Sequence, residues 1–256
     1  MENSKDKQHN TYEIWLSGLD VYLDMYEKGL KKQANKFMSS FIGEFEHSVS
    51  EEDLRKILCR FCQEICDENK HSQLLSRGNG SLPYDLGRVV WNYLKNQCES
   101  ETMPHMRWAF QLFGKYYNPF NSQLKLDMLK VLKKAYEHKD CDSKTVDLYF
   151  NEILEQLYWG AHHFPDGCII TREAYEKAVE TAEMILAEKQ VPQKLVETYL
   201  YYHKLYQCFY EYEENGREKN FYELCERVGI KYKSMPTYYF QQSIEESQET
   251  NRKKGL

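Results

Sequence analysis

The chain has 256 residues, which is enough for one large domain or two small ones and for a substantial core. Its net charge of -6 disfavours nucleic-acid binding, because that function generally needs a basic face. No apolar run approaches the ~18 residues of a membrane-spanning helix, so the chain is not expected to cross or bind a membrane.

Glycine and proline are scarce, at 12 and 6 residues, whereas tyrosine is abundant at 21. Tight turns of a β-sheet would need more glycine, so we expect an all-α fold. The start of the chain is polar and does not resemble a signal peptide, and the eight cysteines are mostly widely spaced. We therefore expect a cytoplasmic protein whose cysteines act as small buried hydrophobes.

Residues 1–10 are polar, and we expect them to be disordered. Residues 11–70 carry three helical patterns, in which apolar side chains recur at spacings of three and four residues. Gly29 is predicted to separate the first helix from the second. Ser50 is predicted to be the N-cap of the third helix, because three acidic residues follow it.

The clearest loop covers residues 69–83 and is the best candidate for a boundary. Residues 83–230 are predicted to form helical hairpins, in one continuous domain with 11–70, and residues 231–256 to form a polar tail. About ten helices are expected in total, connected by short loops that favour antiparallel neighbours. The predicted later starts or caps are Pro83, Pro104, Asn121 or Ser122, Asp142 or Ser143, Thr171 and Pro192.

A short pattern of an aromatic residue, glycine, four residues and proline occurs twice, 46 residues apart. Gly114 matches Gly160, and Pro119 matches Pro165. We expect each glycine to end a helix and each proline to help start the next. The offset predicts an α-solenoid-like array of hairpins, HEAT-like or tetratricopeptide-like, although the tetratricopeptide signature is missing. The alternative is that such turns recur by chance.

Cys59, Cys62 and Cys66, with His71 close behind, form the pattern nearest to a metal motif. The three cysteines lie on one stripe of a single predicted helix, whereas a tetrahedral site needs ligands from at least two segments. We therefore predict that they pack in the core, and we predict no metal ion and no cofactor.

His162 and His163, with Glu155 nearby, offer a general base or a metal ligand. The two histidines occupy the positions of Tyr116 and Tyr117 in the other copy of the repeated pattern, which favours packing and turn geometry. If the chain is an enzyme or a small-ligand binder with a pocket inside the helical array, our candidates are His162, His163, His203 and Glu155. No phosphate-binding loop or nucleophile elbow is present, so no catalytic residue is assigned.

The predicted helix that begins near Pro192 has two apolar stripes on different faces. Such a helix is usually packed on both sides, but a tyrosine-rich face also suits a binding hot spot. The first stripe comprises Leu195, Tyr199, Tyr202, Tyr206 and Phe209, and the second Tyr201, Leu205, Cys208 and Tyr212. Our candidates for partner binding are Tyr201, Tyr202, Leu205 and Tyr212.

These patterns favour a non-enzymatic interaction protein, either a scaffold or a regulator such as an inhibitor or immunity protein. The expected partner is a protein or peptide, and the acidic balance of the chain favours a basic one. The alternatives are the enzyme or ligand binder described above and, third, a helical nucleic-acid-associated protein.

Overall fold

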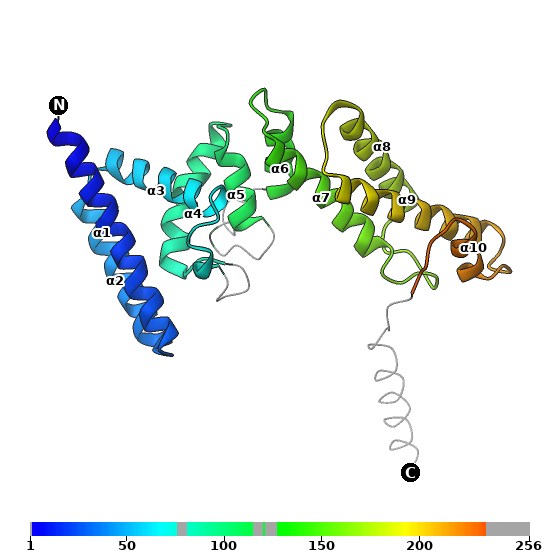
Figure 1. The fold of residues 1–256 in the computed structure, drawn as a ribbon, viewed down its shortest axis with the longest axis horizontal. Coiled ribbons are helices and arrows are strands. Elements are labelled where there is room, and N and C mark those ends of the chain that lie inside the picture. Colours follow the sequence, from blue (N-terminus) through cyan, green and yellow to red (C-terminus); the bar gives the residue numbers. More distant parts are fainter. Residues whose placement is uncertain (1, 76–80, 115–119, 121–126, 234–256) are drawn as a thin grey trace, which may run out of the picture. The chain divides into compact units, whose positions relative to one another are not determined.

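A computed structural model describes residues 2–75, 81–114, 120 and 127–233 (Figure 1). Within these residues the chain forms ten α-helices and one short 3-10 helix, and it forms no strand. The predicted all-α class is therefore confirmed for the described part of the chain. The helices are α1 (Glu2–Glu27), α2 (Lys31–Ser48), α3 (Glu51–Cys66), α4 (Tyr84–Glu99), α5 (His105–Phe113), α6 (Met128–Glu137), α7 (Ser143–Gly160), α8 (Arg172–Glu188), α9 (Gln193–Glu214) and α10 (Phe221–Arg227), with the 3-10 helix at Ser72–Leu74.

Most of the predicted helix boundaries are confirmed. Ser50, Asp142 and Thr171 each accept a hydrogen bond from a backbone N–H three residues further on, as N-caps do. Gly29 separates α1 from α2 with φ +79°, a backbone conformation that glycine adopts without strain. The predicted prolines directly precede their helices, at Pro83 for α4, Pro104 for α5 and Pro192 for α9.

Two boundaries differ from the prediction. Helix α1 begins at Glu2, within the segment expected to be disordered, because a polar stretch can extend a helix without any apolar periodicity. Helix α6 begins at Met128, and its N-cap is Asp127, whereas the predicted caps at 121–122 lie outside the described residues.

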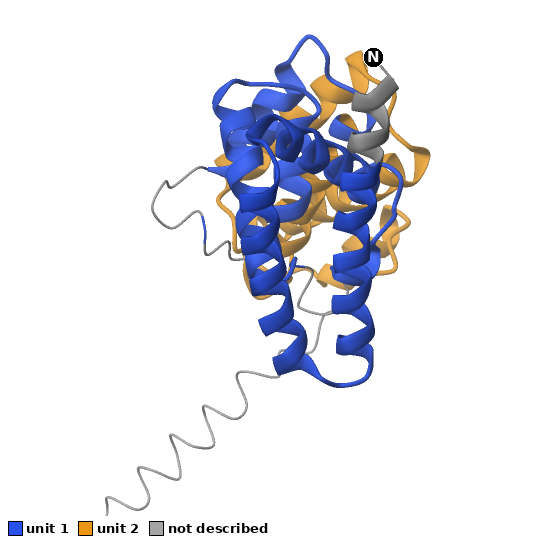
Figure 2. Cartoon of the chain, turned by 90° about the vertical axis from the view of Figure 1, so that its left-hand side faces the viewer, with its two compact units in different colours: residues 1–145 blue, residues 146–256 orange. Residues whose placement is uncertain are grey.

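The chain divides into two compact units, Met1–Thr145 and Val146–Leu256 (Figure 2). The division falls inside α7, so the predicted boundary over residues 69–83 lies within the first unit. Of the predicted tail at 231–256, only residues up to 233 are described.

In the first unit, α1 and α2 lie side by side as an antiparallel pair (Figures 1 and 2). Helix α3 contacts α1, α4 and α5, and α6 packs on α5. The indole of Trp15, which is 1% exposed, lies 5.2 Å from the ring of Phe45 and 5.8 Å from that of Phe61, measured between centroids. Trp15 thereby joins α1, α2 and α3 in one aromatic core.

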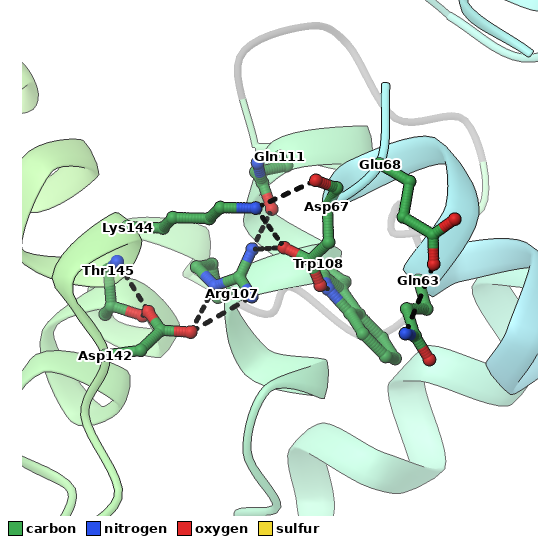
Figure 3. A network of polar contacts seen from close by, with 9 residues as sticks. All are labelled: Gln63, Asp67, Glu68, Arg107, Trp108, Gln111, Asp142, Lys144 and Thr145. Carbon is green, nitrogen blue, oxygen red and sulfur yellow. Dashed lines mark hydrogen bonds and ion pairs between the residues drawn. The ribbon is translucent and has the colours of Figure 1, made fainter. Parts of the chain in front are cut away.

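A buried arginine organises the polar contacts of the first unit (Figure 3). The guanidinium of Arg107, 2% exposed, lies 2.8 Å from the Asp67 carboxylate and 3.0 Å from that of Asp142. Asp67 also accepts hydrogen bonds from the indole of Trp108 at 2.8 Å and from the ammonium of Lys144 at 2.9 Å. The buried guanidinium thus has two carboxylate partners, and the network links the end of α3 to α5 and to the start of α7.

In the second unit, α9 is packed on two faces, as its two stripes predict. On one face the hydroxyl of Tyr206 donates to the Leu157 carbonyl at 3.0 Å, and its ring stacks on Tyr175 of α8 at 4.4 Å. On the other face Tyr212 lies 5.6 Å from Phe221 of α10. Both faces of α9 therefore contribute to the core of this unit.

The repeated pattern is only partly supported. Gly160 is the last residue of α7 and Gly114 directly follows α5, so each glycine ends a helix as predicted. The predicted role of Pro165 is wrong, because α8 begins at Arg172 behind its cap Thr171. Pro119 lies outside the described residues. The helices of the first hairpin have 9 and 10 residues, against 18 and 17 in the second, so the solenoid-like repeat stays a prediction.

Candidate functional site

The end of α7 presents aromatic side chains at the surface of the second unit. Trp159 is 55% exposed. Its ring lies 5.2 Å from Tyr158 and 5.5 Å from His162, and His162 lies 5.1 Å from His163. A large indole left in water between other rings is the kind of side chain that anchors a protein interface.

The same group of rings continues onto α9. Tyr158 lies 6.3 Å from Tyr202, and Tyr202 lies 5.2 Å from Tyr201, which is 36% exposed. Two helices distant in sequence thus form one connected group of partly exposed rings, which we call the aromatic surface. It consists of Tyr158, Trp159, His162, His163, Tyr201 and Tyr202.

Tyr201 and Tyr202 of the aromatic surface are uncharged at neutral pH. Burial, reinforced by the neighbouring Tyr201 and Tyr158, raises the pKa of Tyr202 to about 12. Burial also raises the pKa of Tyr201. The hydroxyls therefore remain hydrogen-bond donors and acceptors, and each ring keeps the negative face that attracts cations.

Further rings lie beside Tyr201. The hydroxyl of Tyr232 donates to the Phe164 carbonyl at 2.7 Å, and its ring lies 6.0 Å from Tyr222, which is 42% exposed. The pKa of Tyr232 is raised, mainly by burial and next by Tyr222. Tyr201 also contributes to this shift, which shows that the two tyrosines are near each other. These two tyrosines extend the aromatic surface towards α10.

The predicted partner-binding residues separate into two groups. Tyr201 and Tyr202 belong to the aromatic surface. Leu205 is 1% exposed, which overturns its prediction as a contact residue, because a buried side chain cannot touch a partner. Tyr212 is half-buried against Phe221 and serves the packing of α10 on α9.

The four residues predicted to line an internal pocket do not lie together in the structure. His162 and His163 lie in the aromatic surface. His203 faces α8 instead, where its Nδ1 lies 3.0 Å from the Tyr175 hydroxyl, and its Nε2 lies 3.0 Å from the Gln207 amide nitrogen. Glu155 is exposed on α7. These contacts place His203 on another side of α9 from Tyr202 and the rings around it.

Tyr158 and Trp159 were not among the predicted site residues. They directly precede Gly160 in the second copy of the repeated pattern. The sequence does indicate that one of these two rings is exposed. Adjacent residues on a helix point about 100° apart, so two neighbouring aromatic side chains do not easily both enter the core. Periodicity alone could not show which of the two faces solvent.

Of the three cysteines on α3 that were predicted to pack in the core, only one is buried there. Cys62 is fully buried, whereas Cys59 and Cys66 are partly exposed. Within the described ranges no group of three or more histidine, cysteine or acidic residues is arranged to hold a metal ion. In the same part of the chain, no helix combines the length and the apolar character needed to span a membrane.

Comparison of the chain with protein-family models, curated proteins and solved structures finds no match in any of the three.

Proposed function

We propose that this chain is a protein-interaction protein and that its aromatic surface binds a protein or peptide partner. The observation that carries the proposal is the 55% exposure of Trp159 within a connected group of rings from α7 and α9. Tryptophan and tyrosine are the residues most enriched in binding hot spots, because they supply a large contact area at a low cost in side-chain entropy.

The charge of the chain is unevenly divided between the two units. Residues 1–145 contain 21 basic and 21 acidic side chains, whereas residues 146–256 contain 13 basic and 19 acidic ones. The whole net charge of -6 thus belongs to the unit that carries the aromatic surface. A negative field of this kind steers a positively charged partner towards the unit and disfavours acidic competitors.

Both features favour a partner segment rich in arginine or lysine. An arginine guanidinium stacks on the face of tryptophan or tyrosine, and such contacts are worth about 0.5–2 kcal/mol each. The acidic unit supplies longer-range attraction to the same cation. A regulatory or inhibitory role, in which the chain covers a basic segment of its partner, follows from this chemistry.

Removing the Trp159 indole should abolish most of the binding. We expect Trp159→Ala to weaken capture of partners from the native cell by at least tenfold, because a central hot-spot residue contributes about 2 kcal/mol or more. Binding by the wild-type chain should also weaken as salt is raised from low to physiological ionic strength. The measurement is affinity capture with quantitative mass spectrometry, followed by titration of the recovered partner.

Leu129→Ala is the matched control, because Leu129 is also 55% exposed but lies on α6 in the first unit. It should leave capture unchanged, and both variants should keep the wild-type melting temperature within a few degrees. Equal capture by Trp159→Ala and wild type would place the binding face elsewhere.

Two broader predictions accompany this proposal. A cytoplasmic location remains a prediction, and the eight free cysteines are what a reducing compartment maintains. The α-solenoid-like stacking of hairpins also remains a prediction. The binding proposal does not require it, because the aromatic surface is formed within α7 and α9 and the segment that directly follows α7.

A further inference from the structure

A cysteine and a histidine meet in the first unit, far from the aromatic surface in sequence. The Sγ atom of Cys59 on α3 lies 3.8 Å from Nε2 of His105, the first residue of α5. The imidazole is held between the ring of Tyr93 at 5.7 Å and that of Trp108 at 5.0 Å. Cys59 and His105 are both partly exposed, so small molecules can reach the pair.

The hydrogen bonds around His105 determine where its proton resides. Nδ1 of His105 lies 3.1 Å from the Thr102 hydroxyl. That hydroxyl has a single proton, which it donates to the carbonyl and side-chain oxygens of Gln97 at 3.1 and 3.0 Å. Thr102 therefore accepts from Nδ1–H, and this tautomer leaves the lone pair of Nε2 directed at the Cys59 thiol.

The surroundings favour a neutral base and a protonated phenol. Burial lowers the pKa of His105, so the imidazole is neutral at pH 7 and can accept a proton. Burial and the hydrogen bond with Cys59 raise the pKa of Tyr93 well above its ordinary value. The Tyr93 hydroxyl thus keeps its proton and can donate it in a hydrogen bond to a thiolate. Cys62 on α3 also lies near the thiol, and Arg55 lies near the Tyr93 hydroxyl.

A cavity of about 300 Å³ is lined by Tyr93, which contacts both Cys59 and His105, although neither of these two residues lines it. Gln97, which accepts a hydrogen bond from the Thr102 hydroxyl, also lines the cavity. Asn92, Asn96 and Arg55 bring N–H donors to the lining, and Glu46 and Glu51 bring carboxylates, of which Glu51 pairs with Arg55 at 2.7 Å.

We propose that Cys59 is a nucleophile, that His105 is its general base, and that the substrate is an acyl ester or thioester. The arrangement has the three parts that such chemistry needs: a thiol, a base in contact with it, and a group that orients the base. Thr102 is a positioning residue, since it acts through His105.

The reaction balances with the residues present. The thiol proton moves to Nε2 of His105 as Sγ attacks the carbonyl carbon, and an Sγ–C bond forms. The bond from carbon to the leaving oxygen or sulfur breaks, and the imidazolium returns its proton to that leaving group. Water then attacks the acyl-Cys59 thioester, with His105 accepting the water proton and returning it to the sulfur, which releases a carboxylic acid.

The test uses the full chain and p-nitrophenyl acetate as the acyl donor. We expect release of p-nitrophenol and transient acetylation of Cys59, located by peptide mass spectrometry. His105→Asn should slow acetylation of Cys59 by about 100-fold, since a general base typically contributes 10²–10⁴-fold. His47→Asn, at an exposed histidine of α2, should leave the rate unchanged. Acetylation at other cysteines but not at Cys59, or an equal rate in His105→Asn, overturns the proposal.

The pH profile of the wild-type chain gives a second test that needs no folded variant. With neutral His105 as base, alkylation of Cys59 by iodoacetamide should already be on its plateau at pH 7. Its rate should fall only in acid, below the ordinary histidine pKa of about 6.5. In this probe reaction an S–C bond forms, iodide leaves and His105 takes the thiol proton. A rate that keeps falling about tenfold per pH unit from pH 8 to pH 6, as reaction through the free thiolate alone requires, would overturn the role of His105.

Discussion

Asp67→Ala should lower the free energy of unfolding by about 3–5 kcal/mol, since it removes one partner of a buried charge. Arg107 is 2% exposed, and without Asp67 its charge is left with Asp142 as its remaining carboxylate contact. The substitution also removes the acceptor of the Trp108 indole N–H and of the Lys144 ammonium. Urea denaturation followed by far-ultraviolet circular dichroism measures the change.

Asp24→Ala is the matched control. Asp24 pairs with Lys28 at 2.7 Å on α1, but the two side chains are 61% and 64% exposed. Pairs of this kind contribute about 0–1 kcal/mol, because water screens them. If the two substitutions cost the same, the buried network does not stabilise the fold in the way its geometry indicates.

The same carboxylate should make the protein sensitive to acid. Burial alone raises the pKa of Asp67, but hydrogen bonds from Arg107, Lys144 and Trp108 outweigh it, and the net shift is downward. A lowered folded-state pKa means that the stabilisation is complete above the unfolded value of about 3.9 and is lost as the pH falls through the folded value. Unfolding free energies measured from pH 6 down to pH 3 should therefore fall more steeply in wild type than in Asp67→Ala.

Gly160→Ala should destabilise the second unit by about 2–4 kcal/mol, through overpacking and a lost buried hydrogen bond. A Cβ atom at Gly160 would lie 2.0 Å from the Tyr206 hydroxyl and 2.7 Å from Ile170. Tyr206 is fully buried, and its hydroxyl donates to the Leu157 carbonyl, so it has no free space to move into. The melting temperature and urea midpoint report the loss.

Gly43→Ala provides the comparison, because Gly43 lies inside α2 and a Cβ there would meet nothing within 4 Å. Alanine at an open helical position should stabilise the chain by about 0.5–1 kcal/mol. A loss at Gly43, or no loss at Gly160, would contradict the close approach of α7 and α9 at this glycine.

The fold was predictable from the sequence where short-range chemistry decides it. The caps Ser50, Asp142 and Thr171 and the break at Gly29 needed only the local pattern, because each side chain acts within one helical turn. The start of α6 was missed, because Asp127 is one of several polar residues in that connection and each of them is a plausible cap.

The candidate sites were less predictable. Helix α9 was correctly identified as rich in two-sided contacts, but the stripe that includes Tyr201 and Leu205 combines an exposed ring with a fully buried leucine. The pairing of Cys59 with His105 was not predicted at all, because 46 residues separate them and no motif links them.

By itself the sequence determined the all-α class, most helix boundaries and the aromatic, acidic character of the chain, since these depend on composition and on neighbours within a turn. Only the tertiary structure decided which aromatic rings stay in water, which glycine makes a close approach and which thiol meets an imidazole. Each of these depends on how helices distant in sequence pack together. Trp159 and Cys59 acquire their proposed roles from neighbours that helical periodicity does not specify.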